Sequence, residues 1–151
     1  DYDDILSPRA DYSKKVINFG DVNADIMPLS ATLTITNRGG APLYVRDVRC
    51  TEEWAVSHTI KVGDEIEAGE TRVYDVELNI SQSYLPIVDY GTATLLSGKI
   101  PEGKPFNARI VLTTNDAMVP YQVITLKAQY HYPKRGLKID GPEKRKRTKR
   151  T

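Results

Sequence analysis

The sequence predicts an all-β protein, built as an antiparallel β-sandwich of seven to eight strands. Three observations favour this fold class. Apolar and polar residues alternate with a period of two along most of the chain, turn residues separate these segments about every ten positions, and no stretch follows the helical period. A barrel is the alternative, whereas the absence of a repeat with a fixed period argues against a solenoid or a propeller.

The alternation locates the strands one after another. Short runs of β-branched and aromatic residues, bounded by turn residues, predict strands at 16–19, 29–36, 43–49, 54–60, 73–80, 91–96, 106–112 and 121–130. In the four clearest strands one face is apolar and is predicted to point into the core: Leu29, Ala31, Leu33 and Ile35; Tyr74, Val76, Leu78 and Ile80; Phe106, Ala108, Ile110 and Leu112; Ile124, Leu126 and Ala128.

Composition divides the chain into three parts. Its 151 residues, 40% hydrophobic and 27% charged, are enough for one domain with tails. Residues 1–13 are acidic, contain a proline and show no period, which predicts an arm or linker before a sandwich at 14–133. Residues 134–151 carry nine Lys or Arg against two acidic residues, a net charge of +7, while the rest has 12 basic and 18 acidic residues, a net charge of −6. An acidic body is thus expected to carry a basic, flexible tail.

No motif in the sequence indicates catalysis. His58 is expected to be a hydrogen-bonded histidine within a strand, and His131 a solvated one at the end of the last strand. Cys50 is expected to be a buried, inert thiol, although Arg46 and Arg49 would lower its pKa if they pointed toward it. Two distant histidines and one cysteine do not make a metal site, and no nucleophile elbow, phosphate loop or dinucleotide motif is present. We therefore expect a non-enzymatic protein without a metal or another cofactor.

The basic tail is the sharpest local feature of the sequence. Six cations lie within seven residues: Lys144, Arg145, Lys146, Arg147, Lys149 and Arg150. Such a segment can bind a polyanion through counterion release, an anionic lipid surface or an import receptor, but it lacks the aromatic residues that would stack on bases. The alternative is a solvated terminus that only aids solubility.

The sequence also bears on location and on contact surfaces. It contains no run of about 18 apolar residues, so no transmembrane segment is expected. The chain opens at Asp1 without a signal peptide, and we expect it to be a processed or excised piece of a longer product. Five tyrosines could form an aromatic contact patch, but we favour their placement in the core and at strand ends: Tyr84, Tyr90, Tyr121, Tyr130 and Tyr132.

The turns between the strands resemble those of a known superfamily. The motifs are Ile17-Asn18-Phe19-Gly20-Asp21-Val22, Asn37-Arg38-Gly39-Gly40-Ala41-Pro42-Leu43, Ala68-Gly69-Glu70-Thr71 and Val111-Leu112-Thr113-Thr114-Asn115-Asp116. Over residues 14–130 the chain resembles the bacterial immunoglobulin-like domains of unknown function that are related to the abnormal-spindle/hydin and major-sperm-protein superfamily. Because these motifs are turn chemistry, they specify an immunoglobulin-like sandwich better than they specify a function. Bacterial members often have two nearby cysteines after the third strand, where this chain has only Cys50.

The resemblance implies a non-enzymatic structural or protein-interaction module in a cell-envelope or extracytoplasmic assembly, with a periplasmic or cell-surface location. Protein partners would bind along a sheet edge or through loops. A pilus chaperone is a lesser hypothesis, since those proteins have two domains and this chain could be at most half of one. The alternative function is polyanion binding, to nucleic acid or an anionic surface, through the basic tail.

Overall fold

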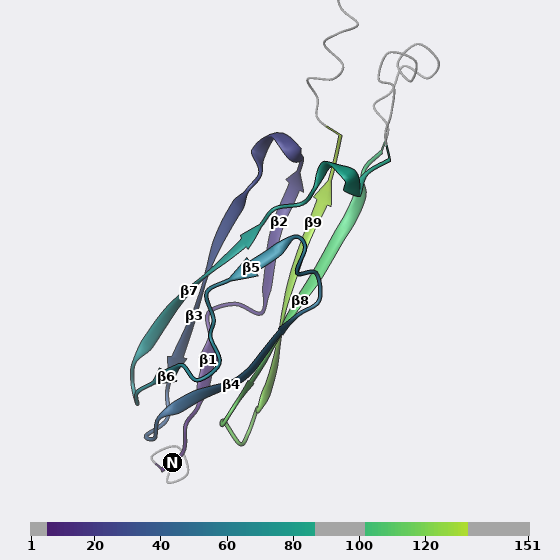
Figure 1. Cartoon of the computed structure of the whole chain (residues 1–151). Helices are drawn as coiled ribbons and strands as arrows, with labels where there is room; N and C mark the ends of the chain where they lie inside the picture. The colour runs from purple at the N-terminus through teal and green to yellow at the C-terminus, as the bar shows by residue number, and fades with distance from the viewer. Residues whose placement is uncertain (1–5, 87–101, 133–151) are drawn as a thin grey trace, which may run out of the picture.

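Two β-sheets packed face to face form the fold, in a computed structural model that describes residues 6–86 and 102–132 (Figure 1). The four-stranded sheet has the order β1-β3-β7-β5, and the five-stranded sheet has the order β2-β9-β8-β4-β6. This confirms the predicted all-β sandwich, with nine strands in the described residues where seven to eight were expected. The elements are β1 (Ala10–Tyr12), β2 (Val16–Val22), η1 (Ala24–Ile26), β3 (Leu29–Asn37), β4 (Leu43–Cys50), β5 (Val56–His58), β6 (Glu65–Ile66), β7 (Thr71–Leu78), η2 (Gln82–Tyr84), β8 (Lys104–Thr114) and β9 (Tyr121–Tyr130).

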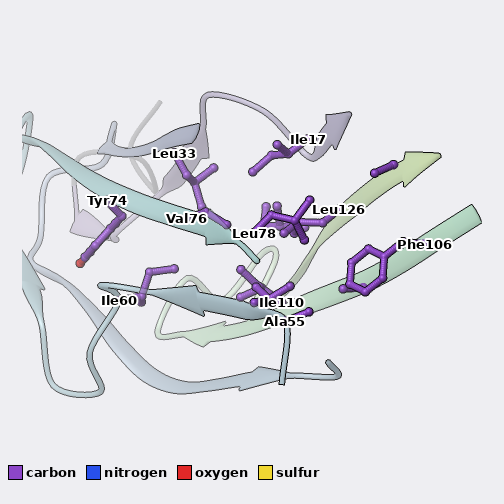
Figure 2. Packing of buried hydrophobic residues seen from close by; sticks show 14 of the residues in the cluster. Ile17, Leu33, Ala55, Ile60, Tyr74, Val76, Leu78, Phe106, Ile110 and Leu126 are labelled. Carbon is purple, nitrogen blue, oxygen red and sulfur yellow. The ribbon is translucent and has the colours of Figure 1, made fainter. Parts of the chain in front are cut away.

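The core lies between the sheets and consists largely of the predicted inward faces. Figure 2 shows Leu33, Val76 and Leu78 of the four-stranded sheet facing Ile110 and Leu126 of the five-stranded sheet, and all five side chains are fully buried. The alternation in β7, β8 and β9 is confirmed at every predicted inward position, while the first two such positions of β3 are half-buried. Successive side chains of a strand point to opposite faces, so a strand that is buried on one face must alternate apolar and polar residues. This is why the sequence predicted the inward positions.

The sandwich begins earlier in the chain than the sequence indicated. Residues 10–12, which were assigned to an arm over residues 1–13, form β1 and pair antiparallel with β3. Tyr12 is 8% exposed and belongs to the core. The predicted start of the sandwich at Lys14 is therefore corrected, because a three-residue strand is too short to show a period.

One pairing differs from the antiparallel prediction. β2 runs parallel to β9, with Val16 opposite Thr125. The register shifts between Asn18 and Gly20, and Gly20 has φ 75°, which glycine adopts without steric cost. All other strand pairs in the described residues are antiparallel.

The predicted strand at 54–60 is shorter than expected. The carbonyl of Glu52 accepts the amides of Ala55 and Val56 in a turn, so β5 begins only at Val56. Trp54 lies in this turn and is 52% exposed. The strand predicted at 91–96 lies outside the described residues.

Candidate functional site

The six cations proposed as a polyanion site lie outside the residues that the structure describes: Lys144, Arg145, Lys146, Arg147, Lys149 and Arg150. The candidate groups that the structure does place are two histidines, one cysteine and the strand edges.

His58 has the structural role that the sequence predicted. It is half-buried at the end of β5, and its Nδ1 accepts a hydrogen bond from the Ile60 amide at 3.1 Å. Burial lowers the pKa of His58 below its usual value. The neutral ring therefore serves as a backbone acceptor within the fold.

His131 and Cys50 are also accounted for by local structure. The Nε2 of His131, just after β9, lies 2.8 Å from Oδ1 of Asp21 in β2, so this pair connects the ends of two parallel strands. Burial raises the pKa of the Cys50 thiol. This is the opposite of the lowered pKa that Cys50 would have if Arg46 and Arg49 pointed toward it. Cys50 is half-buried and keeps its proton at neutral pH.

The described residues bring together no group of the kind that catalysis or metal binding requires. Across residues 6–86 and 102–132, no hydrogen bond joins a histidine to a serine, threonine or cysteine side chain. In the same residues, no three His, Cys, Asp or Glu side chains are placed to hold a metal ion. No helix in this part of the chain is long and apolar enough to cross a membrane.

One end of the sandwich, which we call the polar end, is organised by two buried polar side chains. The Oδ1 of Asn37 accepts the amides of Arg9 and Gly39, while its Nδ2 donates to two carbonyls. The carboxylate of Asp116 accepts three amides, among them that of Ala10 at 2.9 Å. Asn37 is fully buried and Asp116 is 2% exposed. Together they hold the start of β1, at Arg9 and Ala10, against the sandwich.

The opposite end, which we call the aromatic end, is organised by packed rings. Trp54, Tyr84, Phe106 and Tyr130 come from four separate segments, and their ring centroids lie 5.6–5.8 Å apart in consecutive contacts. The Nζ of Lys104 lies 3.9 Å from the centroid of the Tyr84 ring. Most of these contacts are edge-to-face, the geometry that the quadrupole of aromatic rings favours.

The tyrosines follow the favoured interpretation in part. Tyr130 and Tyr132 are buried, and Tyr84 is half-buried at the aromatic end. Tyr121 is 68% exposed, while Tyr90 lies outside the described residues. The four described tyrosines therefore do not form one exposed aromatic patch.

The two sheets meet along two lateral flanks, where the chain passes from one sheet to the other. On the β1–β2 flank the amide of Ser13 donates to Thr34 of β3, and the carbonyl of Lys15 accepts from Thr125 of β9. The edge strands of this flank, β1 and β2, are three and seven residues long.

The other flank, which we call the β4–β5 flank, has shorter edge strands. Here the amide of Thr59 donates to Asp75 of β7, and the amide of Gly63 donates to Val45 of β4. β5 has three residues and β6 has two, whereas their neighbours β7 and β4 have eight each. Among residues 6–86 and 102–132, therefore, no strand lies beside much of the outer edge of β4 and β7. Sequence analysis did not identify this feature, because the turn-rich segment before β7 gives no signal for where its short pairings stop.

No protein-family model matches the chain, and no curated protein matches it. Similar solved structures include a protein of unknown function from Porphyromonas gingivalis W83, with TM-score 0.58 and 18% identity over 81% of this chain and 46% of that one. They also include the YadV chaperone, with TM-score 0.50 and 14% identity over 80% of this chain and 51% of that one. The ASH or PapD-like domain of human CEP192 has TM-score 0.50 and 10% identity over 85% of this chain and 89% of that domain.

These likenesses concern the fold. The chain spans about half the length of the first two structures and nearly all of the third. They agree with the immunoglobulin-like sandwich, which was the fold that the resemblance implied.

Proposed function

We propose that this chain is a non-enzymatic protein-interaction module that binds protein partners along its β4–β5 flank. The observation that carries the proposal is the mismatch between two long strands and the short segments that cover their outer edges. Unpaired strand edges offer a row of backbone donors and acceptors to another chain.

The similar structures support a role in binding proteins. One of them is a chaperone, and another is a domain of a larger human protein. In the part of the chain that the structure describes, no nucleophile and base are joined as they are in an active site. A binding role needs none of these, only an accessible and complementary surface.

The proposal extends to a cell-envelope assembly, with a periplasmic or cell-surface location. Its support is the resemblance of the turn motifs to bacterial immunoglobulin-like domains. Fractionation of cells that produce the natural protein tests this point, and recovery in the cytosolic fraction would contradict it.

The experiment for the interaction function is in-cell chemical cross-linking of the full chain, followed by mass spectrometry. We expect a small set of partner proteins cross-linked to lysines near the β4–β5 flank, such as Lys61. A matched bait in which the six tail cations are replaced by glutamine should recover the same proteins. Absence of any specific protein partner, or turnover of a substrate by the purified chain, would refute the function.

A second candidate function is polyanion binding by the tail, which the density of positive charge at 144–150 favours. In this case affinity for heparin or duplex DNA would fall linearly with salt on a log–log plot. The glutamine-substituted tail would abolish that binding while leaving the fold intact. Binding that persists in the substituted chain, or that does not respond to salt, would exclude this function.

A further inference from the structure

The edge of β4 that faces away from β8 is only partly paired. β6 covers this edge at Leu43 and Tyr44. The preceding loop extends the pairing by one residue, since the amide of Gly63 donates to the carbonyl of Val45 and the amide of Val45 donates to the carbonyl of Asp64. Beyond Val45, the described residues contribute no further backbone hydrogen bond to this edge.

The backbone of Val48 and Cys50 points outward along the unpaired stretch. The amide of Thr51 donates to the carbonyl of Arg109 at 3.0 Å, which identifies these two as a hydrogen-bonded pair of the β4–β8 ladder. Hydrogen-bonded and non-hydrogen-bonded pairs alternate in an antiparallel ladder. Val48 and Cys50 occupy the alternate positions, so their N–H and C=O groups face away from β8. Four backbone groups are thus in place to pair with another strand.

A groove lies just before this stretch in β4, between that strand and the loop that precedes β6. It has a volume of about 350 Å³ and is lined by Tyr44, Val45, Arg46, Val62 and Gly63. Val62 is 60% exposed and Tyr44 is 36% exposed. An added strand would bury part of this apolar surface, and removing apolar surface from water favours association.

The groove carries a positive charge that is not neutralised. The guanidinium carbon of Arg46 lies 5.7 Å from the centroid of the Tyr44 ring, and no carboxylate of the described residues forms an ion pair with it. Arg49, in contrast, is paired with Asp47 at 2.9 Å. A carboxylate on an incoming strand would therefore meet Arg46 without a competing partner.

We propose that the free edge of β4 is the docking site for an extended acidic segment of a partner protein, which adds to the five-stranded sheet as a further strand. The backbone of the segment pairs with Val48 and Cys50, a carboxylate faces Arg46, and an apolar side chain covers Val62. This inference rests on the proposed function and deepens it, because it names the edge and the chemistry of the partner.

The test is an NMR titration of the ¹⁵N-labelled full chain with two capped seven-residue peptides, one alternating valine with aspartate and the other alternating valine with lysine. We expect the aspartate peptide to shift the amide resonances of Val48 and Cys50 and to slow their hydrogen exchange at least tenfold. The lysine peptide should do neither at the same concentration. Failure of the aspartate peptide to bind, binding at another edge, or equal binding of the lysine peptide would overturn the proposal.

A pair of charge reversals provides the matched control. Arg46→Glu should weaken binding of the aspartate peptide at least tenfold, while Arg49→Glu, an equal change in net charge three residues away, should alter it less than about twofold. Equal losses from both variants would show only a general electrostatic effect and overturn the docking site. The spectra of both variants also show directly whether they remain folded.

Cross-linking separates this site from the broader function. If Arg46→Glu recovers the same partners as the unaltered chain, the docking site is wrong and the interaction function stands. If the unaltered chain recovers no partner, the interaction function falls as well.

Discussion

The two ends of the sandwich are stabilised by different physical means. At the polar end, Asn37 and Asp116 form seven hydrogen bonds to backbone groups, and three of these reach segments that are distant in the sequence. At the aromatic end, the rings around Phe106 fill space and contribute few hydrogen bonds. The polar end should therefore depend on the direction of individual bonds, and the aromatic end on the volume of its side chains.

The largest effect is expected from removing volume at the aromatic end. Phe106 is 2% exposed and contacts both Trp54 and Tyr84. Phe106→Ala should lower the free energy of unfolding by about 4 kcal/mol, because it leaves a cavity in the core. Trp54→Ala, at a half-exposed ring, should cost only about 1 kcal/mol.

Urea unfolding followed by circular dichroism measures both variants, since the method does not depend on the single tryptophan. A cost below about 1.5 kcal/mol for Phe106→Ala would mean that the aromatic end relaxes around the missing ring. The contrast between the two ends would then lose its basis.

The next largest effect tests the polar end. Asn37→Ala should cost about 3 kcal/mol, because it leaves two backbone amides and two backbone carbonyls inside the protein without their hydrogen-bond partner. The control is Asn115→Ala, since Asn115 bonds two backbone groups where Asn37 bonds four, and is half-buried, so about 1 kcal/mol is expected there. Similar losses for both, measured by urea unfolding, would show that neither burial nor the number of bonds sets the cost.

This contrast also explains what the sequence could and could not predict. The inward faces of β7 and β8 followed from alternation, because burial on one side of a strand is a local pattern. The turn at 37–42 was also predicted, but not that Asn37 would bond the amide of Arg9, 28 residues away. The amide of Ala10 is 106 residues from Asp116, so nothing near Ala10 in the sequence marks β1 as a strand.

The candidate site was less predictable for the same reason. The sequence suggested a sheet edge or loops as the surface to consider, but it did not identify which edge. That depends on β6 being two residues long and on the loop at Gly63 pairing with Val45, both of which are tertiary facts. The partners of Phe106 at the aromatic end likewise come from separate segments, which no local pattern connects.

A smaller effect is expected where a backbone passes closely over a glycine at each end. A Cβ at Gly39 would overlap the carbonyl oxygen of Ser7 at the polar end, and one at Gly103 would overlap that of Tyr130 near the aromatic end. Each substitution by alanine should cost about 2 kcal/mol, since backbone must move. Gly20→Ala, which meets no atom within 4 Å, is the control and should cost about 1 kcal/mol for its positive φ alone.

Hydrogen exchange distinguishes the two glycine variants. Gly39→Ala should speed exchange of the β1 amides and leave those of β9 unchanged, whereas Gly103→Ala should do the reverse. Faster exchange throughout the sandwich in either variant would mean that the ends are coupled and do not respond separately.

The smallest effect at neutral pH concerns one buried tyrosine at each end. The hydroxyls of Tyr12 and Tyr130 have no hydrogen-bond partner among the described residues; that of Tyr12 lies near Thr114 without meeting hydrogen-bond geometry. Replacing either tyrosine by phenylalanine should change the free energy of unfolding at pH 7 by less than about 1 kcal/mol, because no paired group is lost.

At alkaline pH the Tyr12 variant should become distinguishable. Burial, and secondly the charge of Asp116, raise the pKa of Tyr12 from 10.0 to about 12. Between these values the unfolded chain loses this proton while the folded chain keeps it, so the stability of the unaltered protein falls as pH rises above 10. At pH 11 the titration of Tyr12 should lower the free energy of unfolding by about 1 kcal/mol. Tyr12→Phe should not show this loss. Burial also raises the pKa of Tyr130, so Tyr130→Phe should change in the same direction. If Tyr12→Phe loses stability between pH 10 and 11 as steeply as the unaltered chain, burial of this hydroxyl does not govern the alkaline sensitivity of the polar end.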